Sequence, residues 1–493
     1  MKSCQGYPVL PVLLKDGYKV GHKFQYPKNT TKVSSNLTPR ASRIPSITKI
    51  VSFGFQAFVI KWLQRYYNDF FFSQPKELAV ARYKRRIDNY LGKDTVDVAH
   101  IGELWELGYL PIEVKAIPEG TLVPLRVPMF TITNTVPEFF WLTNMLETLI
   151  SCETWQPMTN ATVALEYRKV FERWAEITGA PKEFIDWQGH DFSMRGMAGV
   201  DAATISGAAH LLSFTGTDTI PAIDFLEDFY DADSDKELIA GSVPATEHSV
   251  MCMGLKDGEF ETFKRLITEV YPSGFISIVA DTWDFWQVIT DYIPRLKNEI
   301  LARDGRVVIR PDSGDPVKII VGAFHGATDA ERHGAIGCLW DIFGGKINEK
   351  GYKELDTHIG LIYGDSINLE RQEQILVGLA LKGFASSNVV LGIGSYTYQY
   401  NTRDTFGFAI KATYGELDGV GQAISKDPKT DDGVKKSASG LLRVEEENGT
   451  LVCYENQTLE QEKQGLLQTI FKDGKIYNKT TLSEIRTRLR NQR

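Results

Sequence analysis

The sequence contains few cysteines, and their positions indicate no structural zinc site. The five cysteines are scattered along 493 residues, and no two have the Cys-x-x-Cys spacing. This usage is typical of a reducing compartment. No apolar run approaches the roughly 18 residues of a membrane span, and the first residues lack the basic-then-apolar pattern of a signal peptide. We therefore expect a cytoplasmic protein that does not enter a membrane.

An excess of positive charge is also missing. The formal net charge is −8, with 55 lysines and arginines against 63 aspartates and glutamates. This balance argues against a general nucleic-acid-binding protein, but it still allows local basic pockets for phosphates. Two common nucleotide-binding patterns are absent as well: no Gly-x-Gly-x-x-Gly begins a strand-helix unit, and there is no Walker lysine motif.

A repeated rhythm is present between about 185 and 400. A short apolar run leads into a polar loop, and in most repeats a helical pattern follows. The apolar runs lie at 211–214, 275–280, 306–309, 359–363 and 389–391. Such repetition predicts a parallel α/β architecture. The number of repeats favours a closed or irregular α/β barrel over two Rossmann halves.

The segments on either side have a different pattern. Helical spacing predicts helices at 53–67, 75–91, 137–150 and 161–179, and short antiparallel strands between 112 and 135. After the barrel we expect strands at 408–414, 441–444 and 450–454, and a basic, solvated helix at 484–493. We expect three parts: 1–180, a catalytic barrel at 181–400, and 401–493. The first and last would form one discontinuous, mainly-β domain.

The loops after the barrel strands carry the residues that can do chemistry, because active sites of such barrels lie at the carboxyl ends of the strands. Each residue alone has a structural alternative, since Asp or Ser before a helix is usually an N-cap. Together they predict a pocket with several carboxylates, at least two arginines and a glycine loop. The residues are Asp191, Arg195, Asp218, Glu247, His248, Asp281, Asp284, Arg310, Asp312, Gly364, Asp365, Gly392, Gly394 and Ser395.

The stretch at 241–249 contains a histidine, His248, directly after Glu247. A histidine can be an acid, a base, a metal ligand or a phosphate acceptor, and the alternative is a hydrogen-bonded histidine in a buried turn. Its neighbours suggest phosphate chemistry. Glycine turns before helices offer backbone N–H groups to anions, and the arginines Arg195, Arg310 and Arg403 can bind phosphate oxygens bidentately.

Carboxylates complete the predicted pocket. Asp365, beside a glycine loop, can hold ribose hydroxyls. The other carboxylates can position Mg²⁺ through water, since Mg²⁺ usually keeps its waters and takes substrate phosphates as ligands. The pocket therefore looks suited to a phosphorylated ribose with a metal.

The same residues resemble the nicotinamide phosphoribosyltransferase family, one of the type II phosphoribosyltransferases. The resemblance rests on HDFSMRG at 190–196, TGTDT at 215–219, SVPATEHS at 242–249, RPDSGDP at 310–316 and YGD at 363–365. It extends to DGYKV at 16–20, QYP at 25–27, VKAIPEG at 114–120 and FKDGK at 471–475, and thus covers nearly the whole chain in order. Each motif is short, but the combination is highly specific.

The resemblance implies an enzyme that joins nicotinamide to 5-phosphoribosyl 1-pyrophosphate, giving nicotinamide mononucleotide and pyrophosphate in NAD salvage. It implies coupling to ATP hydrolysis through phosphorylation of His248, with Glu247 or Asp281 orienting the ring. Mg²⁺ would be held mainly through substrate phosphates, with no residue assigned as a direct metal ligand. It also implies a homodimer with shared active sites.

Residue roles follow from the same resemblance. Phe192 would stack on one face of the pyridine and Tyr18 of the other subunit on the opposite face, with Asp16 beside it. Asp218 would accept the amide NH₂, Arg310 would hold the amide oxygen or a phosphate, and Asp312 the ribose or the metal shell. The ribose and 5′-phosphate would lie against Gly364, Asp365, Gly392, Gly394 and Ser395, with Arg195 nearby. Pyrophosphate or ATP phosphates would be bound by Arg40, Arg403, Lys411, Lys426 and Lys435 or Lys436.

Three alternatives remain open. The nearest is nicotinate phosphoribosyltransferase, which has the same fold and reaction; a carboxylate at Asp218 favours an amide and repels a carboxylate substrate. The second is a non-catalytic binding or signalling protein that keeps the fold. The third is a glycoside hydrolase with a carboxylate pair on a barrel, against which the phosphate-binding arginines and glycines argue.

Overall fold

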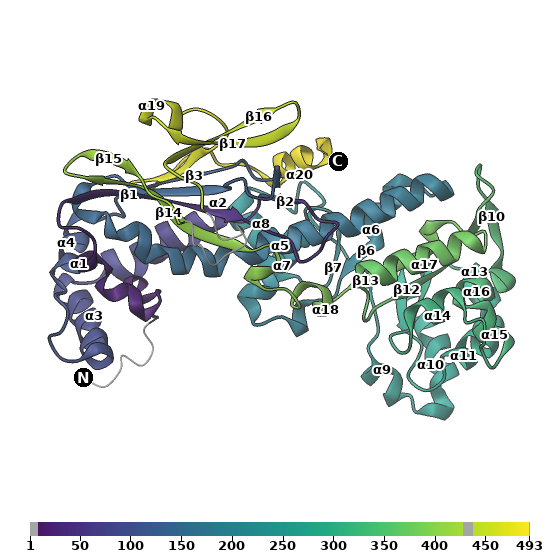
Figure 1. Cartoon of the computed structure of the whole chain (residues 1–493). Helices are drawn as coiled ribbons and strands as arrows, with labels where there is room; N and C mark the ends of the chain where they lie inside the picture. Colours follow the sequence, from purple (N-terminus) through teal and green to yellow (C-terminus); the bar gives the residue numbers. More distant parts are fainter. Residues whose placement is uncertain (1–7, 427–436, 493) are drawn as a thin grey trace. The chain divides into compact units, whose positions relative to one another are not determined.

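The computed structural model describes residues 8–426 and 437–492, and the chain divides into two compact units (Figure 1). We call them the barrel unit, made of residues 163–225 and 233–400, and the terminal unit, made of the described residues of 1–162, 226–232 and 401–493. Among the described residues, no helix combines the length and apolar character needed to cross a membrane.

The barrel unit is built on a six-stranded parallel sheet. Its strand order is β7-β6-β13-β12-β9-β8, and every neighbouring pair is parallel. β8 and β12 are buried along their whole length, as expected for parallel strands covered on both faces. The strands are β6 (Gly189–Asp191), β7 (Gly216–Thr217), β8 (Ile276–Val279), β9 (Val307–Arg310), β12 (Ile359–Tyr363) and β13 (Val389–Ile393).

The segment at 241–246 joins the two edges of this sheet. Gly241 forms a parallel bridge with Gly216 of β7, and Ala245 forms one with Ser277 of β8. Backbone hydrogen bonds from Thr217 N to Gly241 O (3.1 Å) and from Thr246 N to Ser277 O (2.9 Å) support both bridges. The curled sheet is therefore completed by an irregular strand, which confirms the predicted irregular α/β barrel.

Helices follow the strands, and side-chain caps mark several of their starts. Asp284, Asp315 and Asn368 each accept a backbone N–H in the first turn of the helix that follows. The helices are α6 (Ile185–Gln188), α7 (Val200–His210), α8 (Pro221–Tyr230), α9 (His248–Met253), α10 (Glu259–Arg265), α11 (Phe285–Gln287), α12 (Ile293–Arg295), α13 (Lys297–Leu301), α14 (Pro316–Val321), α15 (Asp329–His333), α16 (Ala335–Phe343), α17 (Leu369–Leu381) and α18 (Ser395–Tyr398), with a hairpin of β10 (Gly345–Ile347) and β11 (Lys353–Leu355).

The strand predicted at 211–214 is wrong. These residues form the turn that ends α7, and the strand of this repeat is the two-residue β7. Leu211, Leu212 and Phe214 are buried, so their apolar character reflects packing. A short apolar run cannot be assigned to strand or turn by periodicity alone. The other four predicted strands are confirmed as β8, β9, β12 and β13.

The terminal unit contains a seven-stranded antiparallel sheet that combines both ends of the chain. Its order is β15-β14-β1-β5-β3-β18-β19, so β14 pairs with β1 and β18 pairs with β3. The strands are β1 (Thr30–Pro39), β3 (Ile112–Ala116), β5 (Phe130–Asn134), β14 (Phe408–Leu417), β15 (Val420–Ala423), β18 (Gln468–Lys472) and β19 (Lys475–Ile476), and separate pairs are made by β2 (Lys49–Val51) with β4 (Leu122–Pro124) and by β16 (Leu441–Glu447) with β17 (Thr450–Gln457).

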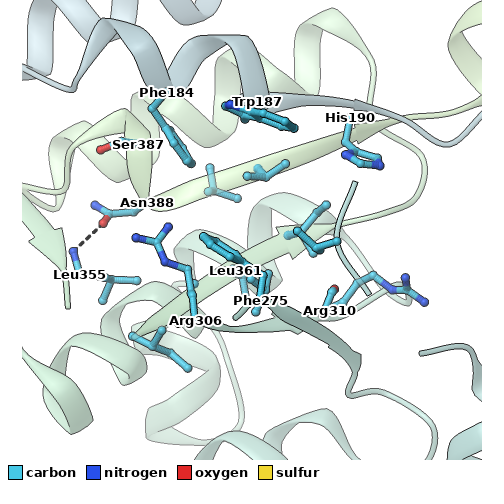
Figure 2. Close-up of a pocket in the computed structure, with 18 of the residues that line it drawn as sticks. Phe184, Trp187, His190, Phe275, Arg306, Arg310, Leu355, Leu361, Ser387 and Asn388 are labelled. Carbon is cyan, nitrogen blue, oxygen red and sulfur yellow. Dashed lines mark hydrogen bonds between the residues drawn. The ribbon is translucent and has the colours of Figure 1, made fainter. Parts of the chain in front are cut away.

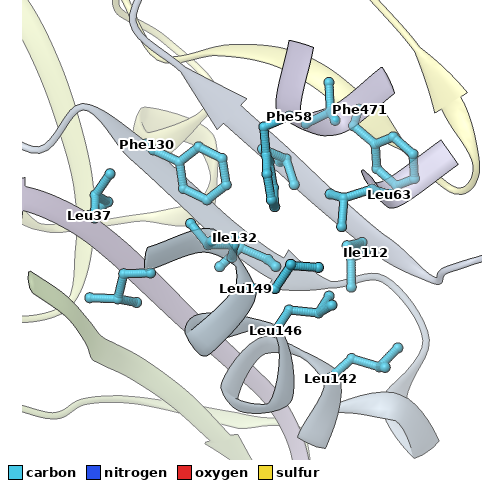
Figure 3. Packing of buried hydrophobic residues seen from close by; sticks show 14 of the residues in the cluster. Leu37, Phe58, Leu63, Ile112, Phe130, Ile132, Leu142, Leu146, Leu149 and Phe471 are labelled. Atoms are coloured by element: carbon cyan, nitrogen blue, oxygen red, sulfur yellow. The ribbon is translucent and has the colours of Figure 1, made fainter. Parts of the chain in front are cut away.

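Helices pack against this sheet to form the core of the terminal unit. In Figure 3, Leu142, Leu146 and Leu149 of one long helix lie against Phe130 and Ile132 of β5. Their spacing places all three leucines on one helix face. The helices are α1 (His22–Gln25), α2 (Phe55–Phe58) with a π-helical continuation η3 (Val59–Tyr66), α3 (Lys76–Leu91), α4 (Ala99–Leu107), α19 (Leu459–Glu462), α20 (Leu482–Asn491) and the first part of α5 (Trp141–Thr178). Residues 163–178 of α5 belong to the barrel unit.

Two helix predictions need correction. The helices expected at 137–150 and 161–179 are one helix, α5, with Pro157 inside it. A proline removes one backbone hydrogen bond, but Met158 and Ala161 beside it are fully buried, and their packing holds the helix together. α20, expected to be solvated, buries Leu482, Ile485 and Leu489, so one face of this basic helix belongs to the core.

Candidate functional site

His248 stands at the start of α9 with a carboxylate against its ring. Its Nε2 lies 3.1 Å from Oδ1 of Asp281, which follows β8. The Asp281 side chain is only 5% exposed, whereas that of His248 is 48% exposed. Asp281 Oδ2 accepts hydrogen bonds from the Asp312 backbone N–H (3.1 Å) and the Ser313 hydroxyl. Asp281 is thus a fixed, buried partner for a histidine that remains accessible.

Glu247, the other carboxylate proposed to orient His248, has a different partner. Its Oε1 accepts a hydrogen bond from the hydroxyl of Ser249. The structure therefore places Asp281, and not Glu247, against the imidazole ring.

Asp312 lies in the same cluster with one oxygen unused. Its Oδ1 is buried and has no hydrogen-bond partner within the described chain. Burial raises the pKa of Asp312; Arg310 opposes this shift, Asp281 and Asp365 add to it, and His248 opposes it. A Cβ atom on Gly364 would overlap Asp312 Oδ1, so the glycine leaves room for this carboxylate. A buried, unpaired oxygen among carboxylates suits a cation or a hydroxyl donor.

Arg310 connects the end of β9 with the segment that completes the barrel. Its Nη2 donates to the carbonyl of Thr246 at 2.7 Å, and its Nε lies 3.6 Å from Asp312 Oδ2. Thr246 is held in turn, since its hydroxyl accepts the Val279 N–H at 2.9 Å. Arg310 therefore has a fixed position next to both Asp312 and the loop that carries His248.

Asp218, after β7, receives two donors on one oxygen. His190 Nε2 and the Ser242 hydroxyl each lie 2.9 Å from Asp218 Oδ1. Burial acts to raise the pKa of Asp218, but the hydrogen bonds from His190 and Ser242 and the charge of Arg310 outweigh it, so the pKa lies below its ordinary value. The side chain is 46% exposed. Asp218 is an anionic acceptor that is open to a ligand.

Phe192 and two glycines shape the neighbouring loops. A Cβ atom on Gly392 would lie 2.5 Å from the Phe192 ring, and one on Gly196 would overlap Ser395 Oγ. The Phe192 ring centre lies 4.6 Å from that of His190. Gly392 thus lets an aromatic ring approach the end of β13, next to Gly394 and Ser395. Asp365 and Arg195 are exposed, and Arg195 pairs with no carboxylate of the described chain.

A cavity of about 850 Å³ runs through the barrel (Figure 2). At the carboxyl ends of the strands it is lined by Phe192, Asp218 and Arg310. At the opposite ends it is lined by Arg306 and Asn388, which directly precede β9 and β13. Most of its wall is apolar, including Phe184, Trp187, Phe275 and Leu361. The cavity is concave and largely preformed, as small-molecule sites usually are.

The predicted phosphate-binding cations lie in the terminal unit. Burial lowers the pKa of Lys411; nearby Glu147 opposes this, and Arg40, Lys426 and Arg403 add to it. Arg40, Lys426 and Arg403 therefore lie close enough to Lys411 to repel its charge, and a polyanion would relieve this repulsion. The remaining predicted cation, Lys435, lies outside the described residues, as does Lys436.

Asp16 and Tyr18 are in the terminal unit as well. Asp16 Oδ2 accepts a hydrogen bond from the Thr148 hydroxyl at 2.7 Å. Tyr18 is 67% exposed, and its ring packs edge-on against His22. The candidate residues thus form two groups, one in each unit. Among the described residues, no three His, Cys, Asp or Glu side chains are arranged to hold a metal.

Several residues of the site were not selected from the sequence. His190 and Ser242 hold Asp218, Ser313 holds Asp281, and Arg306 lines the far end of the cavity. His190, Ser242 and Ser313 lie inside the motifs that carry the family resemblance, so position within those motifs was an available signal. No pattern in the sequence indicates that Arg306, at the amino end of a strand, faces the cavity.

Two solved structures share the fold of this chain. The chain has TM-scores of 0.59 with nicotinate-nucleotide pyrophosphorylase from Pyrococcus furiosus and 0.53 with human nicotinic acid phosphoribosyltransferase. The identities are 15% and 14%, and each alignment covers 97% of this chain and 94% or 93% of the other. At such identities the likeness shows the fold, which is that of the type II phosphoribosyltransferases.

Sequence comparisons show the family. The nicotinate phosphoribosyltransferase (NAPRTase) family model matches residues 187–475, and the nicotinamide phosphoribosyltransferase N-terminal domain model matches residues 11–105. The chain belongs to this family of phosphoribosyltransferases, which are glycosyltransferases. It is 51% identical to a nicotinamide phosphoribosyltransferase of Acinetobacter baylyi, over 99% of this chain and 98% of the relative. It is 34% identical to one of Mycoplasma pneumoniae, over 87% and 94%.

Proposed function

We propose that this protein transfers the phosphoribosyl group of 5-phosphoribosyl 1-pyrophosphate to nicotinamide. The products are nicotinamide mononucleotide and pyrophosphate, a step of NAD salvage. One observation supports the choice of nicotinamide. Two donors occupy Oδ1 of Asp218, and the half-exposed side chain, with its other oxygen Oδ2, borders the cavity. A carboxylate accepts hydrogen bonds from an amide NH₂ and repels the carboxylate of nicotinate. The full-length relatives named as nicotinamide phosphoribosyltransferases support the same substrate.

The transfer needs positioned binding groups more than a base. The pyridine nitrogen has a free lone pair and attacks C1 of the ribose as the bond to pyrophosphate breaks, so no proton has to be removed. Positive charge develops on the ribose, and negative charge develops on the leaving group. In this proposal Phe192 stacks on the pyridine, Arg310 binds the amide oxygen or a phosphate, and the loops with Gly364, Asp365, Gly392, Gly394 and Ser395 hold the ribose and its 5′-phosphate, with Arg195 nearby.

The cations of the terminal unit would neutralise the leaving group. Arg40, Arg403, Lys411 and Lys426 form the basic cluster described above, and they are proposed to bind pyrophosphate or the ATP phosphates. We further propose a homodimer in which Asp16 and Tyr18 complete the site of the neighbouring subunit. The high exposure of Tyr18 supports this role, because an exposed aromatic ring can stack on a substrate presented by another surface.

Mg²⁺ is proposed as the metal, held mainly through substrate phosphates. When bound, it would neutralise charge on the departing pyrophosphate. The buried, unpartnered Oδ1 of Asp312, next to Asp281 and Asp365, fits contact with a hydrated cation. In the chain itself, Asp312 would orient the water shell, and Asp281 would keep Asp312 in place by accepting its backbone N–H.

His248 is proposed to couple the reaction to ATP. With Nε2 directed at Asp281, Nδ1 is the nitrogen left to attack the γ-phosphorus of ATP. The N–P bond forms as the bond from the γ-phosphorus to the bridging oxygen breaks and ADP leaves, while the Nε2 proton stays in its hydrogen bond with Asp281. Water later cleaves the N–P bond to release phosphate. The added negative charge near the substrate site would change substrate affinity without taking part in the glycosyl transfer.

One assay tests the function. Nucleotide formation from nicotinamide and from nicotinate is measured with and without ATP, for wild type and for His248→Ala. We expect a clear preference for nicotinamide and an ATP-dependent rate enhancement that His248→Ala abolishes. A preference for nicotinate would overturn the substrate assignment. An ATP enhancement that persists in His248→Ala would overturn the phosphohistidine role, and absence of any turnover would favour a binding protein.

A further inference from the structure

We propose that His190 is a positioning residue that sets the preference for an amide over a carboxylate on the pyridine ring, and that it acts through Asp218. This inference rests on the proposed function, since it concerns how the same pocket distinguishes nicotinamide from nicotinate. His190 has no assigned role in the transfer or in the coupling to ATP.

The hydrogen bonds at Asp218 leave a single oxygen for the substrate. His190 Nε2 and Ser242 Oγ both reach Oδ1 at 2.9 Å, whereas Oδ2 accepts no hydrogen bond from the residues that the structure describes. The backbone of Asp218 is held too, because its N–H donates to the Asp191 carbonyl at 2.9 Å. The carboxylate therefore cannot turn without breaking two hydrogen bonds, and Oδ2 faces a substrate as a pure acceptor.

The imidazole ring of His190 is itself fixed. A Cβ atom on Gly216 would lie 2.7 Å from His190 Nδ1, so the ring packs directly on the backbone of β7. The Phe192 ring packs on it with centres 4.6 Å apart, and the His190 side chain is 10% exposed. In the described chain Nδ1 makes no hydrogen bond. An ionised carboxylate can only accept hydrogen bonds. His190 Nε2 therefore carries the hydrogen and donates it to Asp218.

The hydrogen bond donated by His190 controls both the orientation of the Asp218 carboxylate and its charge. Burial alone would favour the protonated acid, and the bonds from His190 and Ser242 together with Arg310 reverse this, so the pKa of Asp218 is lowered. Without the His190 N–H, the carboxyl group can rotate and is more easily protonated. A protonated carboxyl group can donate to nicotinate, and discrimination against nicotinate then falls.

Two amide substitutions separate this role from simple packing. The side-chain nitrogen of His190→Gln can occupy the position of Nε2 and donate to Asp218. The side-chain nitrogen of His190→Asn corresponds to Nδ1 and cannot reach Asp218. The measurement is the ratio of kcat/KM for nicotinamide to kcat/KM for nicotinate. We expect the ratio to fall on the order of ten-fold or more in His190→Asn, the effect of losing a hydrogen bond to a charged group, and to stay within about threefold of wild type in His190→Gln.

A double-mutant cycle tests whether His190 acts through Asp218. Asp218→Ser alone should lower the ratio, and adding His190→Asn should lower it no further, because the shared interaction is already lost. The matched control is His333→Asn, since His333 forms an exposed pair with Asp341 at 3.1 Å on α15 and α16; it should leave the ratio unchanged.

Each outcome supports or overturns the role of His190. Equal ratios in His190→Asn and wild type, or a further loss in the double variant, would overturn the role of His190 while leaving the proposed function intact. If wild type itself does not prefer nicotinamide, the proposed function fails first. If His190→Asn does not fold, as judged by circular dichroism, His190→Gln decides: a ratio collapsed towards one in this folded donor variant contradicts the proposal, and a retained ratio supports it.

Discussion

At the scale of single residues, His210 shows how a buried polar group is kept neutral. This histidine ends α7, donates from Nε2 to the Gly216 carbonyl at 3.0 Å, and accepts the Tyr398 hydroxyl on Nδ1 at 2.6 Å. Its ring stacks on Phe214. Burial lowers the pKa of His210 to about 4. The neutral ring thus holds the carbonyl of Gly216, the residue of β7 on which the His190 ring packs.

This pKa predicts a dependence of stability on pH. An unfolded histidine has a pKa of about 6.5, so between about pH 6.5 and pH 4 the unfolded state binds a proton that the folded state excludes. The stability contribution is complete above pH 6.5 and is lost as the pH falls, by about 2 kcal/mol at pH 5. In His210→Gln, which cannot titrate, the drop in unfolding free energy from pH 7.5 to pH 5 should be smaller by about this amount, measured by urea unfolding.

The control for this prediction is His333→Gln, because His333 lies on the surface. It should keep the pH dependence of the wild type. An identical pH dependence in His210→Gln and wild type would contradict the assignment of His210 as a neutral, buried group.

At the scale of elements, the proline inside the long helix α5 packs against a glycine at the start of α2. Gly54, just before α2, has a φ of +96°, and a Cβ atom there would lie 2.6 Å from Pro157 Cγ of α5. The proline that interrupts the hydrogen bonding of α5 therefore packs on the turn that starts α2. Both features belong to the terminal unit, and together they explain why a proline is tolerated inside this helix.

Gly54→Ala should destabilise the terminal unit through both effects. The left-handed backbone conformation costs about 1 kcal/mol, and the overlap with Pro157 adds about 2 kcal/mol. Gly108→Ala is the matched control, since Gly108 has a φ of +79° but nothing within 4 Å of its Cβ position. Urea unfolding should show a larger loss for Gly54→Ala than for Gly108→Ala. Equal losses would mean that contact with Pro157 does not constrain this turn.

At the scale of the whole molecule, the proposed dimer predicts complementation between inactive subunits. Tyr18→Ala removes the ring that one subunit would lend to its neighbour, and Asp312→Asn disables the subunit's own barrel site. In a heterodimer of the two variants, one of the two sites combines an intact barrel with an intact Tyr18. An equal mixture, unfolded and refolded together, should therefore recover about a quarter of wild-type activity if subunits pair at random.

Two controls accompany the mixing experiment. Each variant refolded alone should stay inactive, and size-exclusion chromatography should show a dimer in every sample. A mixture no more active than the mean of the two separate variants would contradict the sharing of Tyr18 between subunits.

The sequence alone determined the barrel repeats, most of the strands and the loops that carry chemistry. Local patterns suffice there, since a buried parallel strand is a short run of β-branched and apolar residues and its loop begins with polar or glycine residues. The same patterns failed at 211–214, where burial and not strand formation explains the apolar run. They also failed at Pro157, where the packing of the buried Met158 and Ala161 outweighs the lost hydrogen bond.

Only the tertiary structure decided how the chosen residues are paired. Glu247 is adjacent to His248 in sequence, yet Asp281, 33 residues away, contacts its ring. Asp218 owes its orientation to His190 and Ser242 from two other segments. Parallel strands bring loops from distant parts of the chain to one end of the barrel, and the order of those strands is set by non-local packing. Residue types and motifs can therefore be read along the chain, whereas hydrogen-bond partners depend on how the strands assemble.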